Sequence, residues 1–251
     1  MRAYVKVEQP EKFPVTIPEL REMPDDFWKN EILSYILLYY KETENSIIQN
    51  IIEFEKQKER ADIEKAIKKH IKSWFRKNTD FRNDGFIFDD EVGNDGSMQG
   101  FYDFKIQHSY WNYTKSYFPF ECKNLGTTNL LNEYVFVETK DRIDGGMYRY
   151  FIDKYAVNQN FGGLIGFVIY QTDKSIIEQL IEKITANYSN KKIGQLTDVK
   201  IIRNSIFNNS NTIDSIHLRQ NAKSNKSEKI VLHHVIMDFM NCDIVENNLP
   251  D

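Results

Sequence analysis

Apolar residues recur at helical spacing over the first third of the chain. The segments Phe27–Tyr40 and Asn45 to about Lys77 place them three or four residues apart, which predicts amphipathic helices. An irregular arm is expected before these helices because prolines punctuate it, at Pro10, Pro14, Pro18 and Pro24. We therefore predict that residues 1–80 form an N-terminal arm and helical extension packed on a core of residues 81–251.

The hydrophobic period changes to two farther along the chain, which predicts β-strands. Asp103 alternates with apolar neighbours in the segment 100–106, and Glu121 and Lys123 alternate with apolar neighbours in the segment 117–123. Successive strand residues face opposite sides, so each strand has an apolar face and a charged face. If the two strands pair, an aspartate, a glutamate and a lysine converge.

Pro119 constrains the second of these strands. Proline is confined to strand starts, edges and bulges, so this strand is expected to begin at Phe120 or to bulge there. The remaining predicted elements are a short strand near residue 86, a helix over Gly145–Ala156 with Asp144 as its N-cap, a strand over Phe161–Ile169, a helix from Ser175 and a strand over Ile230–Phe239. This order predicts an α/β fold, with a mixed central β-sheet flanked by helices.

Two carboxylates and one amine on neighbouring strands suit the hydrolysis of a phosphodiester bond. Carboxylate oxygens are ligands for Mg²⁺ (or Mn²⁺), so Asp103 and Glu121 are the expected metal ligands. The metal activates a water, while Lys123 orients that water or neutralises the developing charge. The alternative is a solvated ion pair between Glu121 and Lys123, since Glu-x-Lys occurs again at residues 138–140.

The surroundings of these residues resemble the PD-(D/E)xK, or restriction-endonuclease-like, nuclease superfamily. The similarity runs from Gly100 to about Tyr170 and rests on the Asp103 strand, the Phe-Pro-Phe-Glu-Cys-Lys-Asn-Leu strand, the predicted 145–156 helix and the predicted 161–169 strand. The element order in that family is helix, three strands, helix, strand. The resemblance implies a restriction-endonuclease-like core carrying the N-terminal helical extension.

The resemblance also implies roles for single residues. Asp103 corresponds to the aspartate of the second motif, Glu121 and Lys123 to the third motif, and the backbone carbonyl of Cys122 to a further metal ligand. Residues 138–140 lie too close to the next predicted helix to leave room for a strand, so they rank as a decoy. The implied activity is a metal-dependent nuclease, DNA favoured by family frequency, with a role in restriction or antiphage defence, a helicase or ATPase as possible partner and a possible homodimer.

Two more carboxylates extend the candidate site. Glu64 is a candidate for the family's upstream helical carboxylate, and Glu91 is a candidate ligand from the turn-rich loop 84–96. Hairpin turn chemistry is the alternative explanation of that loop, because Asn-Asp-Gly favours tight turns. The basic residues between Lys65 and Lys77 either form a stripe that faces phosphate or belong to a solvated helix face, since acidic residues are interspersed.

Four residues outside this centre are candidate nucleic-acid contacts: Arg149, Lys154, His217 and Arg219. Arg149 and Lys154 lie on the predicted 145–156 helix, where a surface pair of Arg149 with Asp153 is the alternative. His217 and Arg219 belong to the segment 208–229, which its Asn, Ser and Lys content predicts to be a long surface loop. Solvent exposure without a ligand is the alternative for these two.

Composition narrows the function classes. The chain has 251 residues, of which 41% are hydrophobic, enough for a substantial core, and a formal net charge of −4 that argues against a nucleic-acid coat protein. Two cysteines exclude a disulfide scaffold, and no Cys/His spacing suggests zinc. No run approaches about 18 apolar residues and no signal-peptide core begins the chain, so a cytoplasmic protein without a membrane partner is expected. The competing class is a non-catalytic nucleic-acid-binding or assembly subunit that keeps the nuclease fold.

Overall fold

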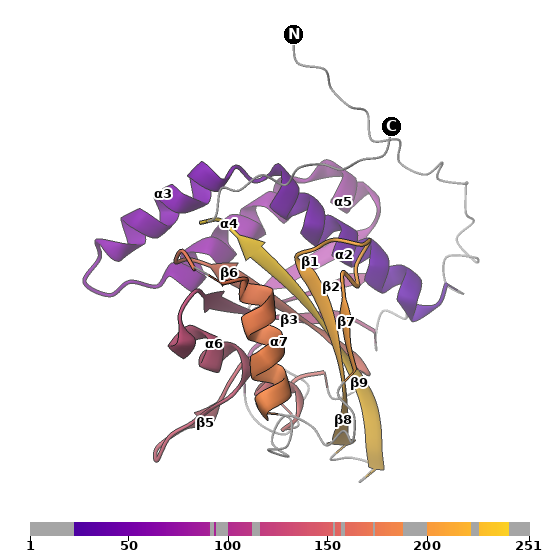
Figure 1. Cartoon of the computed structure of the whole chain (residues 1–251). Coiled ribbons are helices and arrows are strands. Elements are labelled where there is room, and N and C mark those ends of the chain that lie inside the picture. The colour runs from indigo at the N-terminus through magenta and orange to yellow at the C-terminus, as the bar shows by residue number, and fades with distance from the viewer. Residues whose placement is uncertain are drawn as a thin grey trace, which may run out of the picture.

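A seven-stranded mixed β-sheet with helices on both faces forms the body of the protein (Figure 1). The computed structural model describes residues 23–90, 93, 100–111, 116–152, 154–156, 159–172, 174–187, 200–221 and 226–240. In spatial order the strands are β1 (Phe86–Asp90), β2 (Phe104–His108), β3 (Phe118–Leu125), β6 (Phe161–Val168), β9 (Lys226–Asp238), β8 (Thr212–Asn221) and β7 (Lys200–Arg203). The predicted α/β class, with a mixed sheet flanked by helices, is therefore confirmed.

The type of strand pairing changes twice across the sheet, from antiparallel to parallel and back. β1, β2 and β3 are antiparallel neighbours, β3, β6 and β9 run parallel, and β8 and β7 return antiparallel. β6 lies in the middle, and all eight of its residues are buried. A strand covered on both faces reads as a nearly continuous apolar run, which is why Phe161–Val168 was recognisable in the sequence.

Helices before β1 cover one face of the sheet. In the described part of the chain they are α2 (Asp25–Glu42), α3 (Asn45–Lys56), α4 (Ile63–Lys77) and α5 (Thr79–Asn83). The helix predicted from Asn45 to about Lys77 is thus divided in two. Asp62 starts the second half as an N-cap, since its side chain accepts a hydrogen bond from the amide of Lys65 at 3.0 Å.

The other face of the sheet is covered by α6 (Thr128–Val135) and α7 (Ile176–Asn187) (Figure 1). Between them lie a two-stranded sheet of β4 (Val137–Glu138) and β5 (Ile143–Asp144) and the 3₁₀ turn η1 (Tyr148–Tyr150). Buried side chains of α2–α5 form one apolar cluster with the sheet, and those of α6 and α7 form a second. The fold therefore has three layers. Within the described ranges, no helix combines the length and the apolar character needed to cross a membrane.

The helix predicted over Gly145–Ala156 is wrong. Only η1 is helical among the described residues of that segment, and Gly145 has a φ of +146°, which no right-handed helix accommodates. The helix that follows β3 is instead α6, whose N-cap Thr127 accepts a hydrogen bond from the amide of Leu130. Asp144 ends β5 rather than capping a helix.

Three further expectations about single segments are also corrected. β3 begins at Phe118 and has no bulge, since Pro119 pairs in register with Lys105. The proline is tolerated because the ladder to β6 begins only at Phe120. The segment 208–229, predicted as a loop, contributes β8 to a long hairpin with β9. Glu138 lies in β4, so that segment does leave room for a strand. The helix predicted from Ser175 is confirmed as α7.

Close packing of β3 against β6 yields a prediction about Gly163. A Cβ at this position would lie 2.3 Å from the ring of Phe120, which is stacked between Phe104 and Phe118 and cannot retreat. We expect Gly163→Ala to lower the free energy of unfolding by about 1–3 kcal/mol, the usual cost of overpacking a core. Urea denaturation measures this. Gly93→Ala is the control, since a Cβ there meets no atom of a described residue within 4 Å; equal stability of the two variants would contradict the prediction.

Candidate active site

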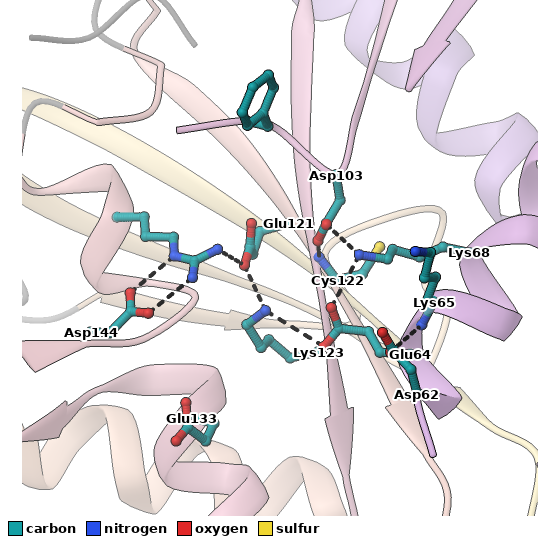
Figure 2. A network of polar contacts seen from close by, with 12 residues as sticks. Asp62, Glu64, Lys65, Lys68, Asp103, Glu121, Cys122, Lys123, Glu133 and Asp144 are labelled. Atoms are coloured by element: carbon teal, nitrogen blue, oxygen red, sulfur yellow. Dashed lines mark hydrogen bonds and ion pairs between the residues drawn. The ribbon is translucent and has the colours of Figure 1, made fainter. Parts of the chain in front are cut away.

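The residues predicted on the two strands meet where β2 and β3 separate. The antiparallel ladder between them ends at Phe120. The next residue on the β2 side, Asp103, turns its carboxylate onto β3, where Oδ2 accepts a hydrogen bond from the amide of Cys122 at 2.6 Å. Glu121 and Lys123 share one face of β3, and Lys123 Nζ lies 2.7 Å from Glu121 Oε1 (Figure 2). The structure thus brings Asp103, Glu121 and Lys123 together.

Helix α4 adds Glu64 and Lys68 to this cluster. Lys68 Nζ lies 2.5 Å from Asp103 Oδ1 and 3.2 Å from Glu64 Oε1, and Lys123 Nζ lies 3.5 Å from Glu64 Oε2 (Figure 2). Glu64, the candidate upstream carboxylate, is therefore placed beside the strand residues. Lys68 was missed as a site residue. Its spacing of four from Glu64 puts both side chains on one helical face, and that was the available signal.

Arg149 reaches the cluster from η1. Its Nη1 lies 2.5 Å from Glu121 Oε1, while Nε and Nη2 donate to the two carboxylate oxygens of Asp144 at 3.0 and 2.9 Å. This bidentate bond to Asp144 fixes the plane of the guanidinium group. Burial raises the pKa of Asp144, but the hydrogen bond and charge of Arg149 outweigh burial and lower it. Arg149 is thus engaged inside the cluster and is not a free surface cation.

The ionised form of Glu121 is disfavoured by the surroundings of its carboxylate. Its side chain is fully buried, and Oε2 has no hydrogen-bond partner among the described residues. Burial first, and then the charge of Asp103, raise the pKa of Glu121 to about 7, although Lys123 and Arg149 act in the opposite direction. The carboxylate therefore changes its charge near neutral pH.

The two lysines of the cluster stay protonated. Burial alone would lower the pKa of Lys123, but the charges of Glu121, Glu64 and Asp103 raise it above its usual value. The pKa of Lys68 is raised in the same way, against burial, by Asp103 and Glu64. Since both amines keep their protons, they supply fixed positive charge and do not act as bases.

The cluster fits a divalent cation in donor type but is not preassembled around one. Among the described residues, no three His, Cys, Asp or Glu side chains converge closely enough to hold a metal ion. Asp103, Glu121 and Glu64 nonetheless offer the oxygen donors that Mg²⁺ prefers. The buried Oε2 of Glu121 also lacks the partner that a buried charge requires.

Two predicted ligands and one predicted contact are less central. The side chain of Cys122 packs in the apolar cluster on the face opposite Glu121, and its backbone lies in the ladder to β6. Lys154 is half-buried, with Nζ 5.9 Å from the ring centre of Tyr155. Glu91 lies outside the described residues, as does the Asn-Asp-Gly turn that was the alternative for its loop. The decoy residues Glu138 and Lys140 are exposed, away from the seven-stranded sheet.

His217 and Arg219 are interior residues, so their assignment as phosphate contacts is corrected. His217 is fully buried and bonded to Ser215 at 2.8 Å. The guanidinium of Arg219 donates to four backbone carbonyls of the segment 150–159 and pairs with Glu228. With its side chain 5% exposed, Arg219 holds that segment in place and presents no surface to a phosphate.

Comparison with known proteins adds no relative to these observations. No protein-family model matches the chain, and neither the curated proteins nor the solved structures give a match.

The burial of Arg219 predicts a structural role. We expect Arg219→Met to lower the free energy of unfolding by about 3–5 kcal/mol, because it leaves Glu228 and four buried carbonyls without their cation. Chemical denaturation measures the loss. Arg203→Met is the matched control, since the pair of Arg203 with Glu178 is 51% exposed on both sides and should matter little. Similar losses in both variants would disprove the assignment.

The raised pKa of Glu121 predicts a pH dependence of stability. A carboxyl group with a higher pKa in the folded state than its usual 4.5 contributes stability that is present below pH 4.5 and lost as the pH rises through about 7. The free energy of unfolding is measured in EDTA for the native protein and for Glu121→Gln. The native value minus the variant value should decrease as the pH rises from 4.5 to about 7 and should then level off. A difference that does not change with pH would show that Glu121 does not titrate in this range.

Proposed function

We propose that this protein is a metal-dependent nuclease that hydrolyses phosphodiester bonds, with DNA as the favoured substrate. The observation that carries the proposal is the meeting of Asp103, Glu121 and Lys123 at the point where β2 and β3 separate, with Glu64 beside them. Three carboxylates beside the charged amine of a lysine are what metal-assisted phosphoryl transfer requires.

The order of elements around the cluster supports the same proposal. With the short elements α5, β4, β5 and η1 set aside, α4 is followed by β1, β2 and β3, then by α6 and then by β6, which runs parallel to β3. This order is compatible with helix, three strands, helix, strand. We therefore propose a restriction-endonuclease-like core, in which α6 takes the place that the sequence suggested for residues 145–156. Fold alone does not fix activity, so the cluster bears the weight of the functional argument.

The division of labour follows from charge and position. Asp103 and Glu121 would hold the metal, with Glu64 as a further oxygen donor. A bound Mg²⁺ or Mn²⁺ supplies a Lewis acid for the phosphate and a water of lowered pKa. Lys123 keeps its proton, so it stabilises negative charge that develops on the phosphate and does not take a proton from water.

Arg149 would act on the reaction indirectly, by orienting Glu121. Its bidentate bond to Asp144 holds the guanidinium in one orientation, and its third contact fixes Glu121 Oε1. A carboxylate held on one oxygen by Lys123 and Arg149 leaves the other oxygen, Oε2, for a cation. Arg149 is therefore a positioning residue, and Lys154 stays the candidate phosphate contact on this side.

The second candidate function is a non-catalytic nucleic-acid-binding or assembly subunit. The observation that favours it is the number of cations in the cluster, since Lys68, Lys123 and Arg149 face Glu64, Asp103 and Glu121. Charges balanced in this way stabilise each other without a metal. A chain with this second function would bind nucleic acid and leave it intact.

Cleavage of plasmid, linear duplex, single-stranded DNA and RNA with Mg²⁺, Mn²⁺ or EDTA tests the proposal. Asp103→Ala and Glu121→Gln should abolish metal-dependent cleavage, because each removes a negatively charged carboxylate ligand. Lys123→Ala should lower turnover by about 10²–10³-fold and leave metal affinity, measured by calorimetry, largely unchanged.

The decoy motif provides matched controls for this experiment. Glu138→Gln and Lys140→Ala remove the same groups from an exposed Glu-x-Lys and should leave cleavage unchanged. Full activity in a nuclease-free preparation of Glu121→Gln would refute the proposal. The absence of cleavage by the native protein, with a helicase or ATPase partner supplied, would favour the non-catalytic subunit.

A further inference from the structure

Two hollows flank the exposed face of α4 and meet along it. A hollow of about 820 Å³ lies between α3 and α4, and one of about 560 Å³ lies between α4 and the strands β1 and β2. Lys65, Lys69 and Ser73 line both hollows. The second hollow also includes Asp103, so one surface runs from α3 across α4 to the candidate active site.

The second hollow is strongly basic although the chain is acidic overall. Six basic residues of α4 line it, against the two carboxylates of Asp90 and Asp103, while the whole chain has a formal net charge of −4. Lys65, Lys69 and Lys77 are exposed and form no ion pair within the described ranges. Positive charge that is left unneutralised on one face of an acidic protein marks a surface for a polyanion.

The length of the basic face suits a nucleic-acid strand. The thirteen residues from Lys65 to Lys77 rise about 18 Å along the helix. One strand of a nucleic acid presents a phosphate about every 3.4 Å of rise in a duplex, so the face matches about five phosphates. The basic face is therefore long enough to meet several successive phosphates of one strand.

Phe54 favours an unpaired strand over other polyanions. Its side chain is 63% exposed and lines the first hollow with Lys65 and Lys69, and Lys58 Nζ lies 4.8 Å from its ring centre. An exposed aromatic ring among cations is the arrangement that binds single-stranded nucleic acid, because bases stack on the ring while phosphates meet the cations. A duplex keeps its bases stacked inside and would leave this ring unused.

We propose that α4 carries a binding track for a single-stranded segment of nucleic acid. Phosphates lie on Lys65 and Lys69, a base stacks on Phe54, and the strand continues along the basic face toward Asp103. That this strand is the substrate rests on the proposed nuclease function, but its binding does not require cleavage.

The test measures binding of fluorescein-labelled 20-nucleotide single strands of unrelated sequence by anisotropy, in EDTA, over a salt series. In the double variant Lys65→Ala/Lys69→Ala, affinity at low salt should fall at least about tenfold for every sequence. The slope of log affinity against log salt should shrink by about 1.4, or about 0.7 for each lost phosphate contact. Lys140→Ala/Lys174→Ala makes the same change in net charge at exposed sites off α4 and should leave both values unchanged.

A second variant separates stacking from charge. Phe54→Ala should weaken single-strand binding about fivefold or more and leave the salt slope unchanged, because a lost stack releases no counterion. Phe207→Ala is its control, since Phe207 is 61% exposed outside both hollows. A duplex of the same sequence should bind more weakly than the single strand and should not respond to Phe54→Ala.

The results also separate this inference from the proposed function. The track is overturned if the native protein does not bind, if the double lysine variant keeps its affinity and slope, or if duplex binds better than single strand. If the native protein cleaves nucleic acid but the double lysine variant keeps its affinity and slope, or duplex binds better than single strand, the nuclease proposal stands without this track. Lysine- and Phe54-dependent binding without any cleavage, with a helicase or ATPase partner supplied, would establish the track and favour the non-catalytic subunit over the nuclease.

Discussion

Burial of the Glu121 carboxylate is the constraint around which the candidate site is organised. A charge inside a protein requires compensating charges and hydrogen bonds, and here they come from different elements. Lys123 comes from β3 itself and Arg149 from η1, while Lys123 also reaches Glu64 on α4. Glu121 and Lys123 together therefore link α4, β3 and η1, and the relative positions of these elements are fixed by electrostatics as well as by apolar packing.

Local periodicity explains which parts of the site were visible in the sequence. Alternation of charged and apolar residues placed Glu121 and Lys123 on one face of a strand, and the structure has them there. Helical spacing likewise placed Glu64 on a helix that the structure lays beside β3. Periodicity could not supply the contacts between elements, so the contacts of Lys68 with Asp103 and of Arg149 with Glu121 emerged only from the folded chain.

The hairpin of β8 and β9 shows why composition misled in the segment 208–229. Its alternation was recognisable, but the polar side chains Ser215, His217 and Arg219 point inward and not toward solvent. They are stable there because distant groups satisfy them: His234 bonds Ser215, and four carbonyls bind Arg219. Partners so far away in sequence leave no local signal, so a polar strand with a buried face reads as a loop.

The position of β9 determines when the sheet around the candidate site is completed during synthesis of the chain. β6 pairs with β3 on one side and with β9 on the other. Arg219 on β8, which pairs with β9, donates hydrogen bonds to the segment that follows Arg149. A ribosome releases the chain from its N-terminal end, so Asp103, Glu121 and Lys123 emerge well before the hairpin that completes the sheet around them. The candidate cluster can therefore reach its folded arrangement only after nearly all of the described chain has been made.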